Sequence, residues 1–416
     1  MGFNSLKWSI NKNRLISRIK ELGQIGRDED NRLTRLAVSD ADKAGRDAIV
    51  DWMKEANLEV IIDRIGNVFG IWSNDDNKDK DPIMVGSHID TVMNAGIYDG
   101  CYGVISGIEV IKTLKEEGFI PSRPIIIGIF TNEEGVRYQP DMMGSLVYAG
   151  GLSVDKALAT VGIDGTLLGE ELDRIGYLGE AEPGFIQPHA YVELHVEQGP
   201  ILEKSNTTIG VVEGVQGISW QRITIEGIAN HAGTTPIDMR QDAGIAAAKV
   251  MTFLRDRVKD LNDSTVVTVG CIEFKPNAIN VVPSQATFTV DLRNPDEERL
   301  KEEEDILENY LEELAHVESV AISTEKLVRF EPVSFDENIA QLIENSANRR
   351  GLKSKRMISG AGHDAQMIAR ICPTAMIFVP SVGGISHNPK EYTPETDLVA
   401  GANVLLDVII QLVELE

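Results

Sequence analysis

The stretch Ile83-Met84-Val85-Gly86-Ser87-His88-Ile89-Asp90-Thr91 decides the fold, because a short apolar run leads directly into a histidine and an aspartate. A second run, Ile125-Ile126-Ile127-Gly128-Ile129-Phe130, leads in the same way into Asn132-Glu133-Glu134-Gly135. Short apolar runs bounded by proline and glycine are typical of buried strands in a parallel sheet covered on both faces. Functional groups of such sheets lie at the carboxyl ends of the strands. The two runs therefore predict an α/β sheet with a metal site at its strand ends.

Helix-like and strand-like segments alternate around these runs. Residues 15–22 and 104–114 carry apolar side chains at helical spacing, whereas residues 60–71 and 191–196 are strand-like. This alternation predicts a mostly parallel sheet sandwiched by helices.

The pattern changes near residue 214. A half-buried strand over 222–226 is followed by a helix over 241–261, strands over 266–272 and 286–292, and a helix over 297–314. That order is typical of an α+β domain with one open sheet face. From residue 330 the chain resumes helix, buried strand and closing helix. Because 416 residues are long for a single core, we predict a discontinuous domain, residues 1–213 and 330–416, interrupted by an inserted domain, residues 214–329.

The composition restricts partners and compartment. The net charge of −25 argues against nucleic acid or an anionic membrane as a partner. Cys101, Cys271 and Cys372 are widely spaced and odd in number, which predicts a reducing compartment and no disulfide framework. The first eight residues lack a signal-peptide pattern, and we expect no apolar stretch of membrane-spanning length. We therefore expect a cytoplasmic protein.

Four acidic residues and a histidine near the two strand ends are candidates for the chemistry. Asp90, in the triplet after His88, is expected to accept one imidazole N–H and leave the other nitrogen for a metal; a structural histidine is the alternative. Asp99 precedes a glycine, where a turn aspartate is the alternative. Glu133 and Glu134 are alternatively a solvated loop, although paired carboxylates after a wholly apolar strand are not where solvation normally places charge.

Together with His195 and His387, which also lie at strand-like ends, these residues form a set suited to two divalent metal ions bridged by one carboxylate. Imidazole and carboxylate ligands suit zinc, manganese or cobalt and lack the thiolates of a structural zinc site. A glutamate outside the ligand set is then available as a general base toward a water whose pKa the metal lowers to about 7.

Six spaced motifs carry a resemblance to a known family: Gly86-Ser87-His88-Ile89-Asp90-Thr91, Tyr98-Asp99-Gly100, Asn132-Glu133-Glu134-Gly135, Glu193-Leu194-His195-Val196-Glu197-Gln198-Gly199-Pro200, Asn230-His231-Ala232-Gly233-Thr234-Thr235-Pro236 and Ser359-Gly360-Ala361-Gly362-His363-Asp364-Ala365. Over nearly the whole chain they resemble the N-carbamoyl-L-amino acid hydrolase, β-ureidopropionase and allantoate amidohydrolase branch of the dinuclear aminoacylase/carboxypeptidase superfamily.

The resemblance implies two divalent ions per subunit (zinc, manganese, cobalt or nickel) and their ligands: His88, Asp99 and His195 for the first ion, and Asp99 as bridge with Glu134 and His387 for the second. Glu133 is implied as the general base. Related peptidases tend to carry a carboxylate at the position of His195, so the histidine favours ureido over peptide substrates.

Substrate-binding residues are implied in the inserted domain, which serves related enzymes as a lid and a dimerisation domain. Arg293 faces the open side of a strand, where a solvated arginine is the alternative; the resemblance makes it the clamp on a substrate carboxylate. His231 and Asn280 match the oxyanion-stabilising and polar substrate residues of the family. A homodimer is therefore expected, with some of these residues acting across the subunit boundary.

Three weaker candidates complete the site. Gly362 precedes an apparent helix whose free backbone N–H groups suit an anionic substrate group, with a plain turn as the alternative. Gln198 and Gln216 are expected to make polar substrate contacts. The sequence after Val215 departs from the Gly-Gln-Arg version associated with allantoate and many carbamoyl enzymes, which weakens the transfer of those contacts to this chain.

The main hypothesis is hydrolysis of a ureido C–N bond in N-carbamoyl-L-amino acids or related ureido acids, giving amino acid, ammonia and carbon dioxide. Allantoate amidohydrolase is the nearest alternative, followed by an aminoacylase or peptidase. A metal-binding protein without catalysis is the alternative from another class. The presence of Glu133 beside a complete ligand set argues against that last alternative.

Overall fold

The structure is a computed structural model that describes residues 8–261 and 263–415. The chain divides into two compact units, which we call the main unit (Met1–Gly214 with Ser334–Glu416) and the insert (Val215–Val333). The insert, predicted over residues 214–329, spans Val215–Val333, and its last strand ends at Phe330. The short strand over Val333–Ser334 begins at the last residue of the insert and pairs in the sheet of the main unit. Residues 1–7, on which the signal-peptide argument depends, lie outside the described residues.

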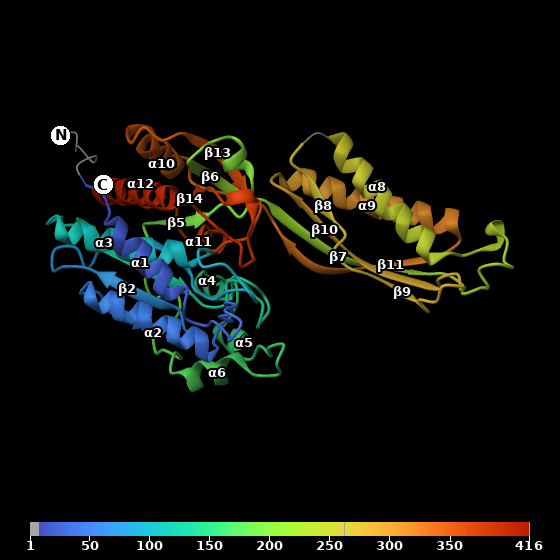
Figure 1. Cartoon of the computed structure of the whole chain (residues 1–416), viewed down its shortest axis with the longest axis horizontal. Coiled ribbons are helices and arrows are strands. Elements are labelled where there is room, and N and C mark those ends of the chain that lie inside the picture. Colours follow the sequence, from blue (N-terminus) through green and yellow to red (C-terminus); the bar gives the residue numbers. More distant parts are fainter. Residues whose placement is uncertain (1–7, 262, 416) are drawn as a thin grey trace. The chain divides into compact units, whose positions relative to one another are not determined.

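The described residues of the main unit form the following elements (Figure 1): α1 (Lys12–Leu22), α2 (Asp40–Glu55), β1 (Glu59–Ile62), β2 (Val68–Trp72), β3 (Ile83–His88), α3 (Cys101–Glu116), β4 (Ile125–Phe130), α4 (Met143–Tyr148), α5 (Val154–Leu158), α6 (Leu168–Ile175), β5 (Ala190–Val196), α7 (Ile201–Lys204), β6 (Ile209–Val215), β12 (Val333–Ser334), α10 (Glu337–Arg349), β13 (Ser354–Ser359), α11 (Asp364–Ile368), β14 (Thr374–Val379), η3 (Val382–Gly384) and α12 (Glu395–Glu414).

The sheet of the main unit is mixed, with a parallel centre. Its strand order is β1-β2-β4-β3-β5-β14-β6-β12, and β13 pairs with β6. Strands β4, β3, β5 and β14 are parallel to their neighbours among these four, whereas β1, β2 and β6 join antiparallel. The predicted α/β class is confirmed, and the parallel centre includes β3, β4 and β5, which lead into the candidate site.

The segment 60–71 is a hairpin and not one strand. β1 and β2 flank a turn in which the Asp63 carboxylate accepts the backbone N–H groups of Ile65 and Asn67 at 3.1 and 2.8 Å. Gly66 has a φ of 81°, a left-handed conformation that glycine adopts without cost. Strands joined by so short a turn are necessarily antiparallel, which explains the mixed edge of the sheet.

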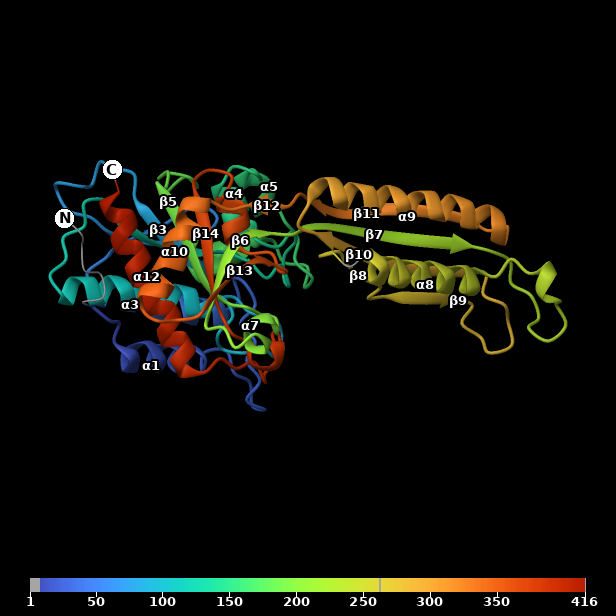
Figure 2. The same ribbon diagram turned by 90° about the horizontal axis from the view of Figure 1, so that it is seen from above.

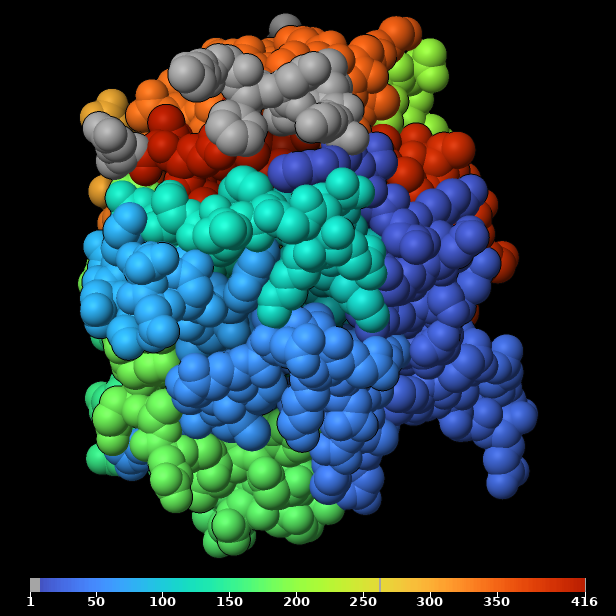
Figure 3. Space-filling view, turned by 90° about the vertical axis from the view of Figure 1, so that its left-hand side faces the viewer, coloured from blue at the N-terminus to red at the C-terminus, as the bar shows by residue number. Residues whose placement is uncertain are grey.

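Two apolar clusters cover the two faces of this sheet. On β3, Ile83 and Val85 pack into the cluster formed with α1, α2, α3, α10 and α12, whereas Met84 points into the cluster formed with α4, α7 and α11. Burial on both faces explains why β3 and β4 are unbroken apolar runs. Figure 3 shows segments that are far apart in the sequence (dark blue, cyan and red) side by side on one face of the main unit, where α1, α3 and α12 are in contact.

The expectation that no apolar segment reaches membrane-spanning length is wrong for the closing helix, α12. Among the described residues it is the one helix long and apolar enough, with 20 residues and a mean hydropathy of 1.6. It packs against α3, α10 and β14, and 67% of its most apolar window is buried inside the protein. That burial is typical of the core helix of a sheet covered on both faces.

In the insert, the residues that the structure describes form β7 (Gly217–Glu226), η2 (Ile237–Met239), α8 (Ala243–Leu261), β8 (Val266–Thr268), β9 (Ile272–Lys275), β10 (Gln285–Asn294), α9 (Glu297–Glu318) and β11 (Ala321–Phe330).

The sheet of the insert has one covered and one open face. Its order is β11-β7-β10-β8, with β9 also paired to β10, so the predicted strand over 266–272 is two strands. Phe288 and Val290 of β10 are buried under α8 and α9, which run along the strands (Figure 2). Asp291 and Arg293 alternate with them and lie half-buried on the open face.

Candidate active site

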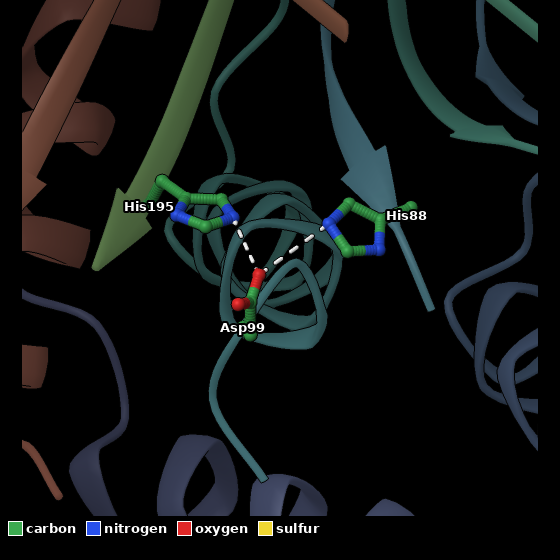
Figure 4. Close-up of side chains that lie close together, drawn as sticks. All are labelled: His88, Asp99 and His195. Carbon is green, nitrogen blue, oxygen red and sulfur yellow. Dashed lines mark ion pairs between the residues drawn. The ribbon is translucent and has the colours of Figure 1, made fainter. Parts of the chain in front are cut away.

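His88 and His195 come from neighbouring parallel strands, which brings their imidazoles to the same edge of the sheet. His88 ends β3, His195 lies near the end of β5, and the Asp99 carboxylate points between the two rings (Figure 4). Asp99 precedes α3, and the next residue, Gly100, has a φ of 62°. A Cβ at Gly100 would lie 2.5 Å from the His88 ring, so only glycine lets the Asp99 loop approach this closely.

Both imidazoles have the tautomer that a metal ligand needs. Nδ1 of His88 lies 3.0 Å from the backbone carbonyl oxygen of Asp90, and Nδ1 of His195 lies 2.9 Å from that of Val196. A carbonyl oxygen only accepts, so Nδ1 carries the proton in each neutral ring and Nε2 keeps its lone pair. The backbone N–H of Gly100 donates to His195 Nε2 at 3.0 Å, which agrees with that assignment.

Both Nε2 atoms face one carboxylate oxygen. Asp99 Oδ1 lies 3.5 Å from His88 Nε2 and 3.2 Å from His195 Nε2. Lone pairs and a carboxylate oxygen repel one another unless a cation, either a proton or a metal ion, lies among them. Burial opposes the charge on Asp99, yet the surrounding imidazoles hold its pKa well below the usual range. The donor set therefore fits a divalent metal ion.

The other oxygen of Asp99 faces a second group. His387 Nε2 lies 3.4 Å from Asp99 Oδ2 and 3.3 Å from Glu134 Oε2. His88, Asp99 and His195 form one group of candidate metal ligands, and Asp99, Glu134 and His387 form another, each with its ligand atoms within 4.8 Å of one another. Asp99 belongs to both, one oxygen to each, which is the arrangement of a bridging carboxylate.

Asp90 acts differently from the sequence-based expectation. Its carboxylate oxygen Oδ1 is 3.8 Å from His88 Nδ1, too far for a hydrogen bond, and its backbone carbonyl holds the ring instead. The carboxylate accepts the backbone N–H groups of Glu133 and Glu134, at 3.3 and 3.2 Å. Asp90 therefore ties the loop after β4 to the end of β3, and so sets where both glutamates lie.

Glu133 is buried next to the first ligand group but belongs to neither group. Its Oε2 lies 3.3 Å from His88 Nε2. Burial raises the pKa of Glu133 well above its ordinary value, and the neighbouring carboxylates Asp364 and Glu134 add to that rise. A buried carboxylate that holds a proton this readily suits a general base that later acts as an acid.

Three residues at the site have left-handed backbone conformations. Asn132, Gln198 and His387 have φ values of 58°, 58° and 52°. Such conformations cost about 1–3 kcal/mol each for residues other than glycine and cluster at functional sites. Asn132 is held in place by hydrogen bonds from its Nδ2 to the backbone oxygens of Tyr138 (2.8 Å) and Pro140 (3.1 Å). His387, by contrast, has a half-exposed side chain.

A set of supporting groups behind the imidazoles was not predicted from the sequence. Glu193 accepts a hydrogen bond from Ser87 Oγ at 2.7 Å and one from the backbone N–H of Ala365 at 2.8 Å. Glu193, His195 and His363 form a third group with ligand-forming atoms close together, but protein donors already occupy both oxygens of Glu193. Glu193 lies two residues before His195 on the same strand face, so the two-residue period of strands was a signal that could have found it.

Gln198 and Gly362 lie in the main unit. Gln198 Nε2 donates to Asp99 Oδ2 at 2.8 Å, so this side chain contacts the bridging carboxylate. Gly362 is half-buried between β13 and α11, where a Cβ would lie 3.0 Å from Met142 Cε. The Gln198 side chain thus lies with the ligand groups, whereas Gly362 has no hydrogen-bonding partner among the residues that the structure describes.

His231 and Asn280 lie on paired segments of the insert. His231 forms an isolated bridge with Val281, and the backbone N–H of Ala232 donates to the Asn280 carbonyl oxygen at 3.0 Å. His231 Nδ1 accepts the backbone N–H groups of Gly233 and Thr234 at 3.1 and 3.2 Å. The neutral ring therefore carries its proton on Nε2, which is free to act as a hydrogen-bond donor.

Arg293 and Gln216 are the other two candidates in the insert. On the open face of β10, Arg293 Nε and Nη2 donate to the Asp291 carboxylate at 3.0 and 2.9 Å. Its guanidinium thus already binds a carboxylate in the geometry expected for a substrate acid group. Gln216 is buried between the end of β6 and the start of β7.

Known proteins similar to this chain identify its family. The model of peptidase family M20/M25/M40 matches residues 84–411. The chain is 37% identical to an N-carbamoyl-L-amino-acid amidohydrolase of Rhizobium meliloti over 98% of this chain and 97% of that protein. It is 34% identical to an allantoate amidohydrolase of Bacillus subtilis (strain 168), over 96% of this chain and 98% of that protein.

A solved structure agrees in fold. An amidase of the hydantoinase/carbamoylase family from Burkholderia multivorans superposes with a TM-score of 0.93 at 40% identity, covering 97% of this chain and 98% of that one. Sequence, fold and ligand groups together show that the chain belongs to peptidase family M20/M25/M40, in its branch of N-carbamoyl-L-amino-acid and allantoate amidohydrolases, and that it is a hydrolase of C–N bonds other than peptide bonds.

Proposed function

We propose that the chain cleaves the carbamoyl C–N bond of N-carbamoyl-L-amino acids or related ureido acids, giving amino acid, ammonia and carbon dioxide. The observation that carries the proposal is the pairing of Asp99, which faces one ligand group with each oxygen, with Glu133, a buried carboxylate outside both groups. The names of the relatives support a ureido substrate.

Two divalent ions per subunit are proposed, one for each ligand group, with zinc, manganese, cobalt or nickel suited to the donors. When bound, such ions supply Lewis-acid polarisation of the attacking water and of the substrate carbonyl. Imidazole and carboxylate donors with open positions fit that role better than a closed structural site.

The residues of the main unit move the proton. Glu133 takes it from the attacking water and returns it to the departing nitrogen, because its burial favours the protonated state between those two steps. Asp90 holds Glu133 and Glu134 in register through their backbone N–H groups. His88 and His195 keep Nε2 unprotonated through their Nδ1 contacts.

The residues of the insert bind the substrate. His231 donates from Nε2 to the oxygen that gains negative charge, where a fixed donor stabilises the transition state most. Arg293 binds the substrate carboxylate in place of Asp291. Asn280, Gln198, Gln216 and Gly362 are proposed as further polar contacts. We also propose a cytoplasmic homodimer formed through the insert.

A substrate panel tests the proposal. The purified chain, loaded separately with each of the four metals, is given N-carbamoyl-L-amino acids, N-carbamoyl-β-alanine, allantoate and N-acetyl-L-amino acids, and ammonia and amino acid release are measured. We expect release from a carbamoyl amino acid with the highest kcat/KM. Preferred turnover of N-acetyl substrates, with little on any ureido acid, would contradict it.

Allantoate is the second candidate, because a relative of that name matches over nearly the full length of both chains. The same residues serve it, since allantoate also carries a carboxylate and a ureido group. In the same panel, a kcat/KM for allantoate above that of every carbamoyl amino acid would select this candidate.

A further inference from the structure

Glu391 is a buried carboxylate that no part of the mechanism uses. It lies four residues after His387, between η3 and α12, and is 6% exposed. Its Oε2 accepts the backbone N–H groups of Tyr98 at 3.0 Å and of Asp99 at 3.4 Å. The side chain therefore connects the loop that carries His387 to the loop that carries Asp99.

A hydroxyl group makes a second connection between the same two loops. Ser386, next to His387, has its Oγ 3.2 Å from Asp99 Oδ2 and 3.4 Å from Glu391 Oε1. The hydroxyl has one proton, so it donates to one of these carboxylates at a time. Glu391 thus reaches Asp99 in two ways, through the backbone N–H and through the Ser386 hydroxyl.

The loop before Asp99 is shaped to receive Glu391. A Cβ at Gly96 would lie 2.0 Å from Glu391 Oε2 and 2.5 Å from Glu391 Cβ, so no other residue fits beside this side chain. The rings of Tyr98 and Tyr392 meet edge to face, with centroids 6.4 Å apart. Polar and apolar contacts therefore hold the two loops together on both sides of the Glu391 carboxylate.

We propose that Glu391 is a positioning residue that locks the Asp99 loop to the His387 loop and so holds the second ligand group together. Asp99 and His387 are 288 positions apart in the sequence, and His387 is the most exposed of the candidate ligands described above. Without the Glu391 carboxylate, the backbone N–H groups of Tyr98 and Asp99 are left unpaired in a buried position. The inference rests on the proposed two-ion site.

The test is the metal content and metal affinity of Glu391 variants. We expect Glu391→Ala to bind the ion of the second group about 10–100-fold more weakly, the loss typical of groups that orient metal ligands, while the first ion stays bound. Metal analysis after dialysis against graded chelator, together with calorimetric titration, measures both ions without using activity. At saturating metal we expect kcat to recover and KM to remain unchanged.

Two further variants separate positioning from a general loss of structure. Glu391→Gln keeps an oxygen for the two backbone N–H groups and is expected to retain both ions at near wild-type affinity. Gly96→Ala keeps Glu391 in the sequence, but the added methyl group fills the space that the Glu391 side chain occupies. We expect it to weaken binding of the second ion as Glu391→Ala does. It supplies the same readout if Glu391→Ala fails to fold.

A matched control is Glu109, another buried carboxylate of the main unit. It accepts the backbone N–H of Asn11 at 2.9 Å and pairs with Arg14 across α1 and α3. Glu109→Gln is expected to lower the Tm without changing the affinity for either ion. A Glu391→Ala or Gly96→Ala protein that binds both ions as tightly as wild type would overturn the inference. A wild-type chain that binds two ions but hydrolyses no ureido acid would overturn the proposed function alone.

Discussion

Asp90 Oδ2 accepts the backbone N–H of Glu134 at 3.2 Å, and this contact, with the matching one from Glu133, fixes two neighbouring glutamates for which we propose different roles. The backbone carbonyl of Asp90 orients His88 separately. A substitution of the Asp90 side chain therefore alters the positions of Glu133 and Glu134 but keeps the contact between this carbonyl and His88 Nδ1.

We therefore predict that Asp90→Ala lowers kcat far more than it raises KM. The loss leaves two backbone N–H groups without their acceptor, at a cost of about 1–3 kcal/mol each, and lets Glu133 move from the reacting atoms. Steady-state kinetics and the Tm measure the two effects. Equal changes in kcat and in the affinity for the first ion would show that Asp90 acts mainly on His88.

Metal binding at pH 7 is predicted to release protons. The hydrogen bond to Asp99, with Glu134 nearby, raises the pKa of His387 to about 9. Burial, with Asp99 nearby, raises the pKa of Glu134 to about 8. Both groups therefore hold protons at pH 7 in the ion-free chain and must lose them to become ligands.

The apparent affinity for the second ion should therefore depend on pH. Protons compete less with the ion for a ligand as the pH rises toward the pKa of that ligand, so the apparent affinity for the second ion should increase from pH 6 to pH 9. Calorimetric titrations in two buffers of different ionisation enthalpy measure the released protons at pH 7. An affinity that stays constant over this range would contradict the prediction.

His231 is predicted to act through Nε2. His231→Asn keeps an oxygen near the position of Nδ1 for the Gly233 and Thr234 N–H groups but loses the donor. We expect kcat to fall by about 10²–10³-fold, the usual loss for one oxyanion donor, with the Tm unchanged. Nitrogen NMR of the wild-type ring should show Nδ1 unprotonated at neutral pH, and a protonated Nδ1 in the neutral ring would contradict this tautomer.

Arg293 is predicted to set the requirement for a substrate carboxylate. Arg293→Lys loses the planar pair of donors and should raise KM about 10–100-fold, as expected for a charged hydrogen-bonded contact, with a smaller effect on kcat. The control is Arg222, an exposed arginine of the same sheet that pairs with Glu325, whose lysine variant should behave as wild type. A similar KM for both variants would show that Arg293 does not bind the substrate carboxylate.

Where one continuous segment contains the information, the sequence predicts the strands of the sheet and the candidate residues that lie at their ends. His88, Glu133 and Glu134 follow apolar runs that are buried on both faces, so their position at the strand ends follows from local pattern. The hairpin at 59–72 was also readable, because Gly66 and Asn67 are typical turn residues.

Contacts between distant loops could not be predicted in this way. Whether His88 is held by the side chain or the backbone of Asp90 depends on the conformation of the turn after β3. Glu391 meets Tyr98 and Asp99 across more than 290 positions, and no local pattern marks that contact. The space that Gly96 leaves for Glu391 is likewise visible only once both loops are placed.

The comparison of Glu133→Gln with Glu134→Gln tests the central claim most directly, because the two residues are adjacent, both side chains are buried, and we propose different roles for them. Each variant is assayed for bound metal and for turnover of the preferred ureido acid. We predict that Glu133→Gln keeps both ions and loses activity by about 10²–10⁴-fold or more, whereas Glu134→Gln binds the second ion weakly. A Glu133→Gln protein with near wild-type turnover, or one that has lost an ion, would contradict the account.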